Sequence, residues 1–223
     1  MTDSHQTSTA KQALVAIQQL QNRVRELEHA GNEAIAVVGM ACHFPGNINS
    51  PTEFWDALVD KKDGIIEIPQ ERWDVEEHFH PHMDVPGKMY TRYGGFIHNI
   101  DQFDAGFFGI SPREAVLMDP QQRLLLQTVC ESFDDGGFDL NHLYGSRTGV
   151  YVGISNFEYG AKGIWPLDKK RITAYSGTGG SLGVAAGRLS YVYGFTGPSM
   201  IIDTACSSSL VTTHLAIQAL RNG

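Results

Sequence analysis

The sequence predicts an α/β fold, because short, largely apolar runs that suit buried strands alternate with segments that suit helices. These runs cover residues 34–38, 149–154 and 199–203. Continuous apolar runs of this length are typical of strands that are buried on both faces of a sheet. Strands that alternate with helices build layered α/β structures. We therefore expect a layered α/β domain.

The expected helices are marked by capping residues. Serine, then proline, then glutamate two residues later recur at 50–53 and 111–114, and Asp119-Pro120 begins a longer helix in a similar way. Serine and aspartate accept hydrogen bonds from the first N–H groups of a helix, and proline suits its first position. A last helix is predicted over 208–221. The stretch 63–100 is rich in proline, glycine, histidine and aromatic residues, and we expect an irregular surface excursion there.

A heptad pattern precedes the domain. Its a positions are Ala10, Ile17 and Val24, and its d positions are Ala13, Leu20 and Leu27. β-Branched residues at a and leucine at d favour a parallel two-stranded coiled coil. About 20 residues of helix, roughly 30 Å, are marginal alone, so this helix needs a dimeric body or a partner helix. The alternative is an amphipathic helix that packs on its own domain.

The predicted organisation therefore has three parts. Residues 1–9 form a polar tail that we expect to be disordered, residues 10–31 form the coiled-coil helix, and residues 33–223 form the α/β domain.

Composition excludes several classes of function. The 223 residues carry a formal net charge of −8 without a basic stripe, which argues against nucleic acid as a partner. Three cysteines, Cys42, Cys130 and Cys206, lack the spacing of a disulfide framework and suit a reducing compartment. The sequence shows no signal peptide and no apolar run long enough to cross a bilayer. We expect a cytoplasmic protein without a membrane partner.

Cys206 is the candidate nucleophile. It lies in the segment DTACSSSL at 203–210, where a predicted strand passes into a predicted helix. Such a corner points the thiol at the positive end of the helix, which favours a thiolate, and the backbone N–H of Cys206 could serve as an oxyanion donor. The small neighbours Ala205 and Ser207 leave room for a substrate carbonyl. His214 lies eight residues further on, about 12 Å along the axis, so we expect a packed helix residue and not a catalytic partner.

The octapeptide at 203–210 resembles the active-site signature of the ketosynthase domain of modular type I polyketide synthases. Further segments match the same pattern in the same order: IAVVGMAC at 35–42, GGF at 94–96, FFGISPREA at 107–115, MDPQQRL at 118–124 and AGRLSY at 186–191. The sequence departs from the pattern at Cys130 and Phe133, where tryptophan and leucine are usual. Both departures fall at expected helix-packing positions, so they leave the candidate nucleophile unaffected.

The resemblance implies a thiolase-like fold, of which this chain holds the N-terminal half of the ketosynthase domain. It implies that Cys206 accepts an acyl chain from the phosphopantetheine of an acyl carrier protein. Decarboxylative Claisen condensation with a malonyl-type extender then follows. Two histidines and a lysine from later motifs assist this reaction in the family, and one histidine belongs to an HGTGT segment that is absent here. We therefore expect a fragment of a longer polypeptide that alone lacks the decarboxylation machinery and is inactive in condensation.

The resemblance also bears on cofactors and partners. It implies no metal and no directly bound cofactor, since the partner acyl carrier protein holds the phosphopantetheine. It implies a homodimer, and it suggests that residues 10–31 dock to an upstream polyketide synthase subunit. A non-catalytic docking or dimerisation fragment that orders subunits of the assembly line is therefore the alternative function.

Two further motifs carry weaker hypotheses. Residues 179–183 satisfy G-x-S-x-G, which would make Ser181 the nucleophile of a serine hydrolase. However, the preceding residues 170–176 make only a weak strand, and the spacing of Gly183 and Gly187 instead predicts a smooth helix face for close packing. His78, His80 and His82 alternate and could bind zinc, but Pro81 and the lack of acidic or sulfur ligands nearby favour a solvated loop.

Overall fold

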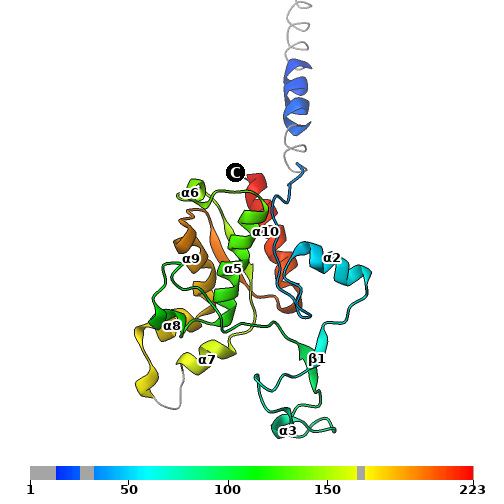
Figure 1. Cartoon of the computed structure of the whole chain (residues 1–223). Coiled ribbons are helices and arrows are strands. Elements are labelled where there is room, and N and C mark those ends of the chain that lie inside the picture. Colours follow the sequence, from blue (N-terminus) through cyan, green and yellow to red (C-terminus); the bar gives the residue numbers. More distant parts are fainter. Residues whose placement is uncertain (1–13, 26–32, 165–168, 223) are drawn as a thin grey trace, which may run out of the picture. The chain divides into compact units, whose positions relative to one another are not determined.

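The computed structural model describes residues 14–25, 33–164 and 169–222 (Figure 1). The chain divides into a smaller unit, residues 1–37 with 213–223, and a larger unit, residues 38–212. After the first helical segment, the elements follow in this order: α2 (Pro51–Val59), β1 (Ile65–Glu67), α3 (Val75–His78), β2 (Tyr93–Gly95), α4 (Pro112–Ala115), α5 (Pro120–Asp135), α6 (Leu140–Leu143), β3 (Val150–Gly153), α7 (Glu158–Ile164), the 3-10 turn η1 (Lys169–Arg171), α8 (Ala174–Gly180), α9 (Leu182–Tyr193), β4 (Ser199–Ile202), the 3-10 turn η2 (Ala205–Ser207) and α10 (Ser208–Asn222).

The smaller unit contains a helical segment over residues 14–25. Its heptad side chains Ile17, Leu20 and Val24 are more than half exposed. The predicted boundaries at 10 and 31 and the tail 1–9 lie outside the described residues. The pairing of this helix into a coiled coil stays a prediction.

The larger unit is organised around two parallel strands. β3 pairs with β4, with Val150 opposite Ser199 and Gly153 opposite Ile202. Parallel strands need a long crossover connection, and here it contains α7, α8 and α9. α9 packs against both strands, and α5 packs against α9. The strands predicted at 149–154 and 199–203 and the layered α/β arrangement are therefore confirmed. The predicted burial holds for β3 but not for β4, whose four residues are exposed or half-buried.

The core of the larger unit lies between α5, α9 and these strands. Met118, Leu126 and Leu189 are fully buried there. The Tyr193 hydroxyl donates a hydrogen bond to the Leu126 carbonyl oxygen at 2.7 Å, and burial raises the pKa of this tyrosine. Phe133 lies edge-on to Tyr193, with ring centroids 6.0 Å apart, so its predicted packing role is confirmed. Cys130 is likewise partly buried against this core.

The predicted helix starts are confirmed at the level of single hydrogen bonds. Ser50 Oγ accepts from the Glu53 N–H at 3.2 Å, and Ser111 Oγ accepts from the Glu114 N–H at 3.3 Å. The Glu53 carboxylate reaches back to the Asn49 N–H, at 2.6 Å, one residue earlier than a capping box predicts. These caps fix where α2 and α4 begin.

The strand predicted at 34–38 is not present. Val37 and Val38 are 77% and 62% exposed, and neither of the two sheets in the described part of the chain includes this segment. An apolar run becomes a strand only where another strand supplies its hydrogen bonds. Local sequence carries no information on that partner, so the prediction was wrong.

The stretch 63–100 is more ordered than we predicted. β1 and β2 pair antiparallel, with Ile65 opposite Gly95 and Glu67 opposite Tyr93, and α3 lies between them in sequence. Each strand is three residues long, and the side chains of β1 are exposed. The segment is a surface excursion, but it is not irregular throughout.

The close approach predicted at Gly183 and Gly187 occurs elsewhere. Both glycines are exposed, and a Cβ atom on Gly187 would meet no atom within 4 Å. Instead, α7 contacts α8 through two glycines, because a Cβ atom on Gly160 would lie 2.0 Å from the Gly180 carbonyl oxygen. The stretch 170–176, predicted as a weak strand, instead contains the end of η1 and the start of α8.

Replacing Gly187 by alanine is therefore expected to stabilise the chain by about 0.8–1.0 kcal/mol, because glycine is a poor helix former and the added methyl group meets nothing. Urea unfolding followed by circular dichroism measures this change. A loss of stability would instead support the close packing that the sequence suggested.

None of the helices within the described ranges is long and apolar enough to span a bilayer.

Candidate active site

Cys206 lies at a sharp corner between β4 and α10. The strand ends at Ile202, the chain turns through Asp203 and Thr204, and the 3-10 turn η2 leads directly into α10. Cys206 is the middle residue of η2, and its side chain is exposed. The predicted strand-to-helix corner is confirmed, and its thiol is accessible within the described structure.

The residue before this cysteine has a strained backbone. Ala205 has φ of +54°, in the left-handed region. For a residue other than glycine this conformation costs about 1–2 kcal/mol. Such strain persists only where the surrounding structure enforces it, and it is often found at functional sites.

Asp203 ties the corner to the loop that follows β3. Its Oδ1 accepts hydrogen bonds from the Ser155 hydroxyl at 2.8 Å and from the Ala205 N–H at 3.0 Å. The hydrogen bond from the Ala205 N–H, followed by that from Ser155, lowers the pKa of Asp203 below its usual value. The group is therefore a carboxylate at neutral pH, and it holds Ala205 from one side.

Ser208 holds the same corner from the other side. Its hydroxyl accepts a hydrogen bond from the Thr204 N–H at 2.9 Å and donates one to the Ala205 carbonyl oxygen at 2.8 Å. The Ser208 residue is only 6% exposed. One side chain at the first position of α10 therefore joins the two peptide groups that flank the turn.

The end of β3 lies directly against the start of α10. A Cβ atom on Gly153 would lie 2.9 Å from Ser208 Cβ and 3.0 Å from the Ser208 carbonyl carbon. Only glycine allows this approach without a shift of one of the two segments. The position of the corner is thus set by β3 as well as by β4.

The backbone N–H groups of the corner are not all used. The turn is formed by the Ser207 N–H, which donates to the Thr204 carbonyl oxygen, and by the Ser208 N–H, which donates to that of Ala205. The Cys206 N–H takes part in neither hydrogen bond. An N–H group beside an exposed thiol is an arrangement that suits attack on a carbonyl carbon, since it can bind the negative oxygen that forms.

The other sequence candidates do not form a comparable site. Ser181 lies between α8 and α9, so a helix precedes it where the hydrolase motif requires a strand, and the hydrolase hypothesis is wrong. His214 is exposed on α10, so its predicted packing is also wrong.

The three histidines at 78, 80 and 82 lie at the end of α3 and just after it. The His82 N–H donates to His80 Nδ1 at 3.2 Å, and the two rings lie 5.5 Å apart. Across the part of the chain that the structure describes, no three His, Cys, Asp or Glu side chains are arranged to hold a metal ion. These histidines therefore provide no support for the zinc hypothesis.

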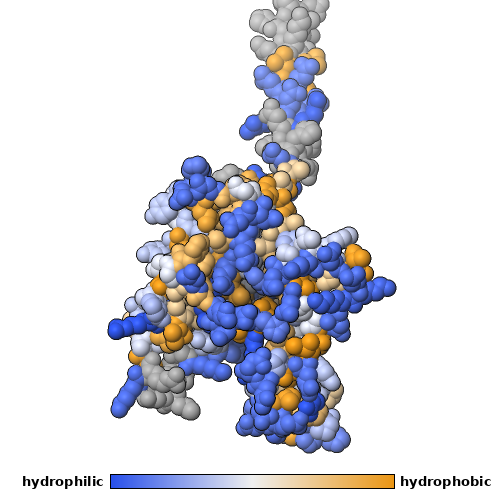
Figure 2. Space-filling model, viewed as in Figure 1, coloured by the Kyte–Doolittle hydropathy of each residue, from blue (hydrophilic) through white to orange (hydrophobic). Residues whose placement is uncertain are grey.

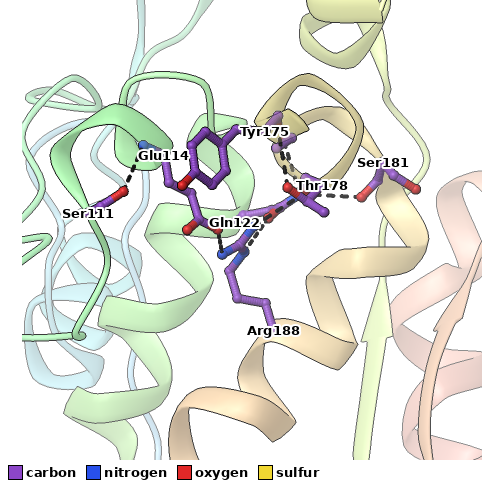
Figure 3. Close-up of polar contacts among 8 residues, drawn as sticks. Ser111, Glu114, Gln122, Tyr175, Thr178, Ser181 and Arg188 are labelled. Atoms are coloured by element: carbon purple, nitrogen blue, oxygen red, sulfur yellow. Dashed lines mark hydrogen bonds and ion pairs between the residues drawn. The ribbon is translucent and has the colours of Figure 1, made fainter. Parts of the chain in front are cut away.

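A separate polar cluster joins four helices and is structural. Arg188 of α9 lies 2.5 Å from the Glu114 carboxylate and donates to Gln122 Oε1 at 2.7 Å (Figure 3). The buried Gln122 amide donates to the carbonyl oxygens of Thr178, Gly179 and Ser181, at 3.2, 3.0 and 3.3 Å. Ser181 therefore contributes its carbonyl oxygen to the packing of α5 on α8.

Comparison with known proteins agrees with this geometry. Residues 32–223 match the family model described as the N-terminal domain of β-ketoacyl synthases. The chain belongs to this family. Its predicted membership is confirmed over nearly the whole length.

Similar proteins are polyketide synthases. The chain is 46% identical over 214 residues to polyketide synthase GfsB of Streptomyces halstedii, covering 96% of the chain and 4% of that protein. It is 45% identical over 214 residues to the pikromycin polyketide synthase component PikAIII of Streptomyces venezuelae, covering 96% of the chain and 14% of that protein. The chain therefore spans only a small part of these relatives.

A solved ketosynthase has the same fold. The ketosynthase from module 6 of the bacillaene synthase of Bacillus subtilis 168 is 42% identical with a TM-score of 0.71, over 85% of this chain and 30% of that one. This similarity confirms the thiolase-like fold and the prediction that the chain is the N-terminal part of a ketosynthase domain.

The sequence did not reveal the residues that support the cysteine. Ser208, Asp203, Ser155 and Gly153 were not predicted to act at this site. One signal was available, because serine beside a helix start tends to form hydrogen bonds with nearby backbone groups. That tendency does not indicate which peptide groups Ser208 would join.

Proposed function

We propose that Cys206 is the acyl-accepting nucleophile of a polyketide synthase ketosynthase, to which this chain contributes the N-terminal part. The single observation that carries this proposal is the exposed thiol at a strained strand-to-helix corner, in a chain of the β-ketoacyl synthase family. The thiol lies at the start of α10, where the helix dipole favours negative charge.

The proposed reaction has two stages. The Cys206 thiolate attacks the carbonyl carbon of an acyl thioester on the phosphopantetheine of an acyl carrier protein, and the carrier thiolate leaves. A malonyl-type thioester on a second carrier then loses CO₂, and the resulting carbanion equivalent attacks the acyl-Cys206 carbonyl. The C–S bond to Cys206 breaks, which releases a β-ketoacyl thioester and regenerates the thiolate. The Cys206 N–H supports this chemistry by binding the oxyanion of each tetrahedral intermediate.

The proposed cofactor, partners and cellular location follow from the family resemblance. The phosphopantetheine belongs to the carrier protein, and this chain itself binds no cofactor. The partners are acyl carrier proteins and a second copy of the chain, in the cytoplasm.

The condensation stage requires more protein than this chain. The histidines and lysine that the resemblance implies lie in later motifs, and the chain covers 30% of the solved ketosynthase. The face of the larger unit in Figure 2 is mixed, with hydrophobic residues among hydrophilic ones, and α2 also exposes large hydrophobic side chains. Trp55, Leu58 and Val59 of this helix are more than half exposed, and large exposed apolar patches mark contact surfaces. The 223-residue chain should therefore accept an acyl group without catalysing decarboxylation.

Intact-mass analysis tests the proposal. Incubation with an acyl N-acetylcysteamine thioester is expected to add one acyl mass to the chain, and Cys206→Ala should abolish this adduct. Cys42→Ala and Cys130→Ala are matched controls that should keep it, because both cysteines are partly buried, and burial raises the pKa of each thiol. An adduct that persists in Cys206→Ala would refute the assignment.

A docking role for the N-terminal helix is the second candidate function. It is favoured by the apolar heptad side chains that residues 14–25 expose. Deleting residues 1–29 is expected to weaken acyl delivery from an upstream polyketide synthase subunit while acylation by the small thioester continues. Equal loss of both would show that the helix belongs to the domain fold.

A further inference from the structure

The conformation of Ala205 is held by the side chains of Asp203 and Ser208. The Ala205 N–H donates to the Asp203 carboxylate, and its carbonyl oxygen accepts from the Ser208 hydroxyl. Hydrogen bonds therefore hold both the N–H and the carbonyl group of Ala205, one on each side of its α-carbon.

The Ser208 hydroxyl also closes a hydrogen-bonded ring with the backbone of Thr204 and Ala205. It accepts from the Thr204 N–H and donates to the Ala205 carbonyl oxygen, so it uses both of its hydrogen-bonding roles on the backbone just before Cys206. Because Ser208 is buried, water has poor access to replace the hydroxyl. Its removal would leave the Thr204 N–H without this partner, and the Ala205 carbonyl oxygen would keep only the Ser208 N–H.

We propose that Ser208 and Asp203 are positioning residues, whose hydrogen bonds hold Ala205 in the left-handed conformation that presents the Cys206 thiol for acylation. This inference rests on the function proposed above. Neither side chain needs to touch the substrate, since both act through the backbone of Ala205.

The left-handed conformation decides where the thiol lies. A change of φ at Ala205 to the ordinary negative range would rotate the chain that follows, and Cys206 is the next residue. The thiol and the N–H of Cys206 would then turn together relative to β4 and the Asp203-Thr204 backbone, so neither would keep its present position. An alanine favours that change when nothing opposes it, whereas a glycine adopts the left-handed region without penalty.

The charge of Asp203 is not what the corner needs. The corner uses Oδ1 of Asp203 as a hydrogen-bond acceptor for the Ser155 hydroxyl and the Ala205 N–H, and an uncharged oxygen can fill that role. Asparagine retains an oxygen that can accept from both Ser155 and Ala205, whereas leucine retains none. Asp203→Leu should therefore slow acylation more than Asp203→Asn does.

The decisive experiment is a double-mutant cycle on the full 223-residue chain. Acylation of Cys206 by the N-acetylcysteamine thioester is timed by intact mass, across substrate concentrations, for the wild type, Ser208→Ala, Ala205→Gly and the double variant. Ser208→Ala is expected to lower the maximal rate about tenfold, with little change in the half-saturating concentration. In the Ala205→Gly background, Ser208→Ala should lower the maximal rate only about threefold or less, since glycine adopts the left-handed region without support.

Thr212→Val is the matched control. Thr212 is buried on α10, and its hydroxyl donates to the Ser209 carbonyl oxygen within the same helix, away from Ala205. This variant loses a buried hydroxyl without loss of the ring, so its acylation rate should stay at the wild-type value. Circular dichroism on every variant confirms that the helices are retained.

Alkylation of Cys206 by iodoacetamide separates this inference from the proposed function. Ser208→Ala should slow alkylation, because the Cys206 thiol loses its present orientation at the corner, even if no acyl group is ever accepted. A wild-type chain that takes no acyl group would refute the proposed function, and slower alkylation in Ser208→Ala would still support the positioning role. If the wild type is acylated and Ser208→Ala is acylated as fast as Thr212→Val, the positioning role is refuted. It is also refuted if Ser208→Ala lowers the acylation rate by the same factor in the wild-type and the Ala205→Gly backgrounds.

Discussion

Replacing Arg188 by methionine is expected to lower the free energy of unfolding by about 3–5 kcal/mol, since the loss of one partner of a buried ion pair leaves the other charge unpaired. The Arg188 side chain is 9% exposed, and it bonds to the carboxylate of Glu114 and to the amide of Gln122. Its Nη2 also lies 3.4 Å from the Thr178 carbonyl oxygen. The substitution therefore removes contacts to α4, α5 and α8 at once.

Urea unfolding followed by circular dichroism measures this effect. The matched control is Arg92→Met, because Arg92 pairs with Glu67 and Glu76, whose side chains are more than half exposed. Exposed ion pairs contribute little to stability, so this variant should change unfolding far less. Adding Glu114→Gln to Arg188→Met should recover part of the loss, because no unpaired carboxylate remains. Equal effects of the two arginine variants would show that the cluster in Figure 3 is not a buried junction.

Those parts of the fold that depend on neighbouring residues could be predicted from the sequence. The caps at Ser50, Ser111 and Asp119 determine helix starts through hydrogen bonds that span two or three residues. The strands β3 and β4 were recognisable because each lies in a short apolar run, although β4 is not buried. In both cases the signal and the structure it determines lie in the same few residues.

Those parts that depend on distant segments could not be predicted. The apolar run at 34–38 looks like a strand, but nothing in it reveals whether another strand pairs with it. The contact between Gly160 and Gly180 has no periodic spacing, because the two glycines come from different helices. The spacing of Gly183 and Gly187 does have a regular period, yet both are exposed and neither meets another helix closely.

The candidate site divides in the same way. Cys206 was recognisable because the residues around it form a distinctive segment at a strand-to-helix boundary. Its support was not recognisable, since Ser155, Asp203 and Ser208 come from the ends of three different elements. The left-handed φ of Ala205 is equally hidden, because alanine shows no preference for that region.

Replacing Gly153 by alanine is expected to impair both stability and acylation. The added methyl group would lie 2.9 Å from Ser208 Cβ and 3.1 Å from the Ser209 backbone nitrogen, so β3 or the start of α10 must move. Crowding of this kind typically costs about 1–3 kcal/mol. Because Ser208 holds the Ala205 carbonyl oxygen, a shift of α10 should also slow acylation of Cys206.

Gly177→Ala is the matched control for this substitution. A methyl group on Gly177 would meet no atom within 4 Å, and the residue lies in α8 without a positive φ. This variant should gain about 0.5–1 kcal/mol, because alanine loses less conformational freedom than glycine when a helix forms. Urea unfolding and the timed acylation assay applied to both variants should therefore show opposite changes in stability and a slower reaction only for Gly153→Ala. A Gly153→Ala chain that is as stable and as rapidly acylated as the wild type would show that the end of β3 does not fix the position of the Cys206 corner.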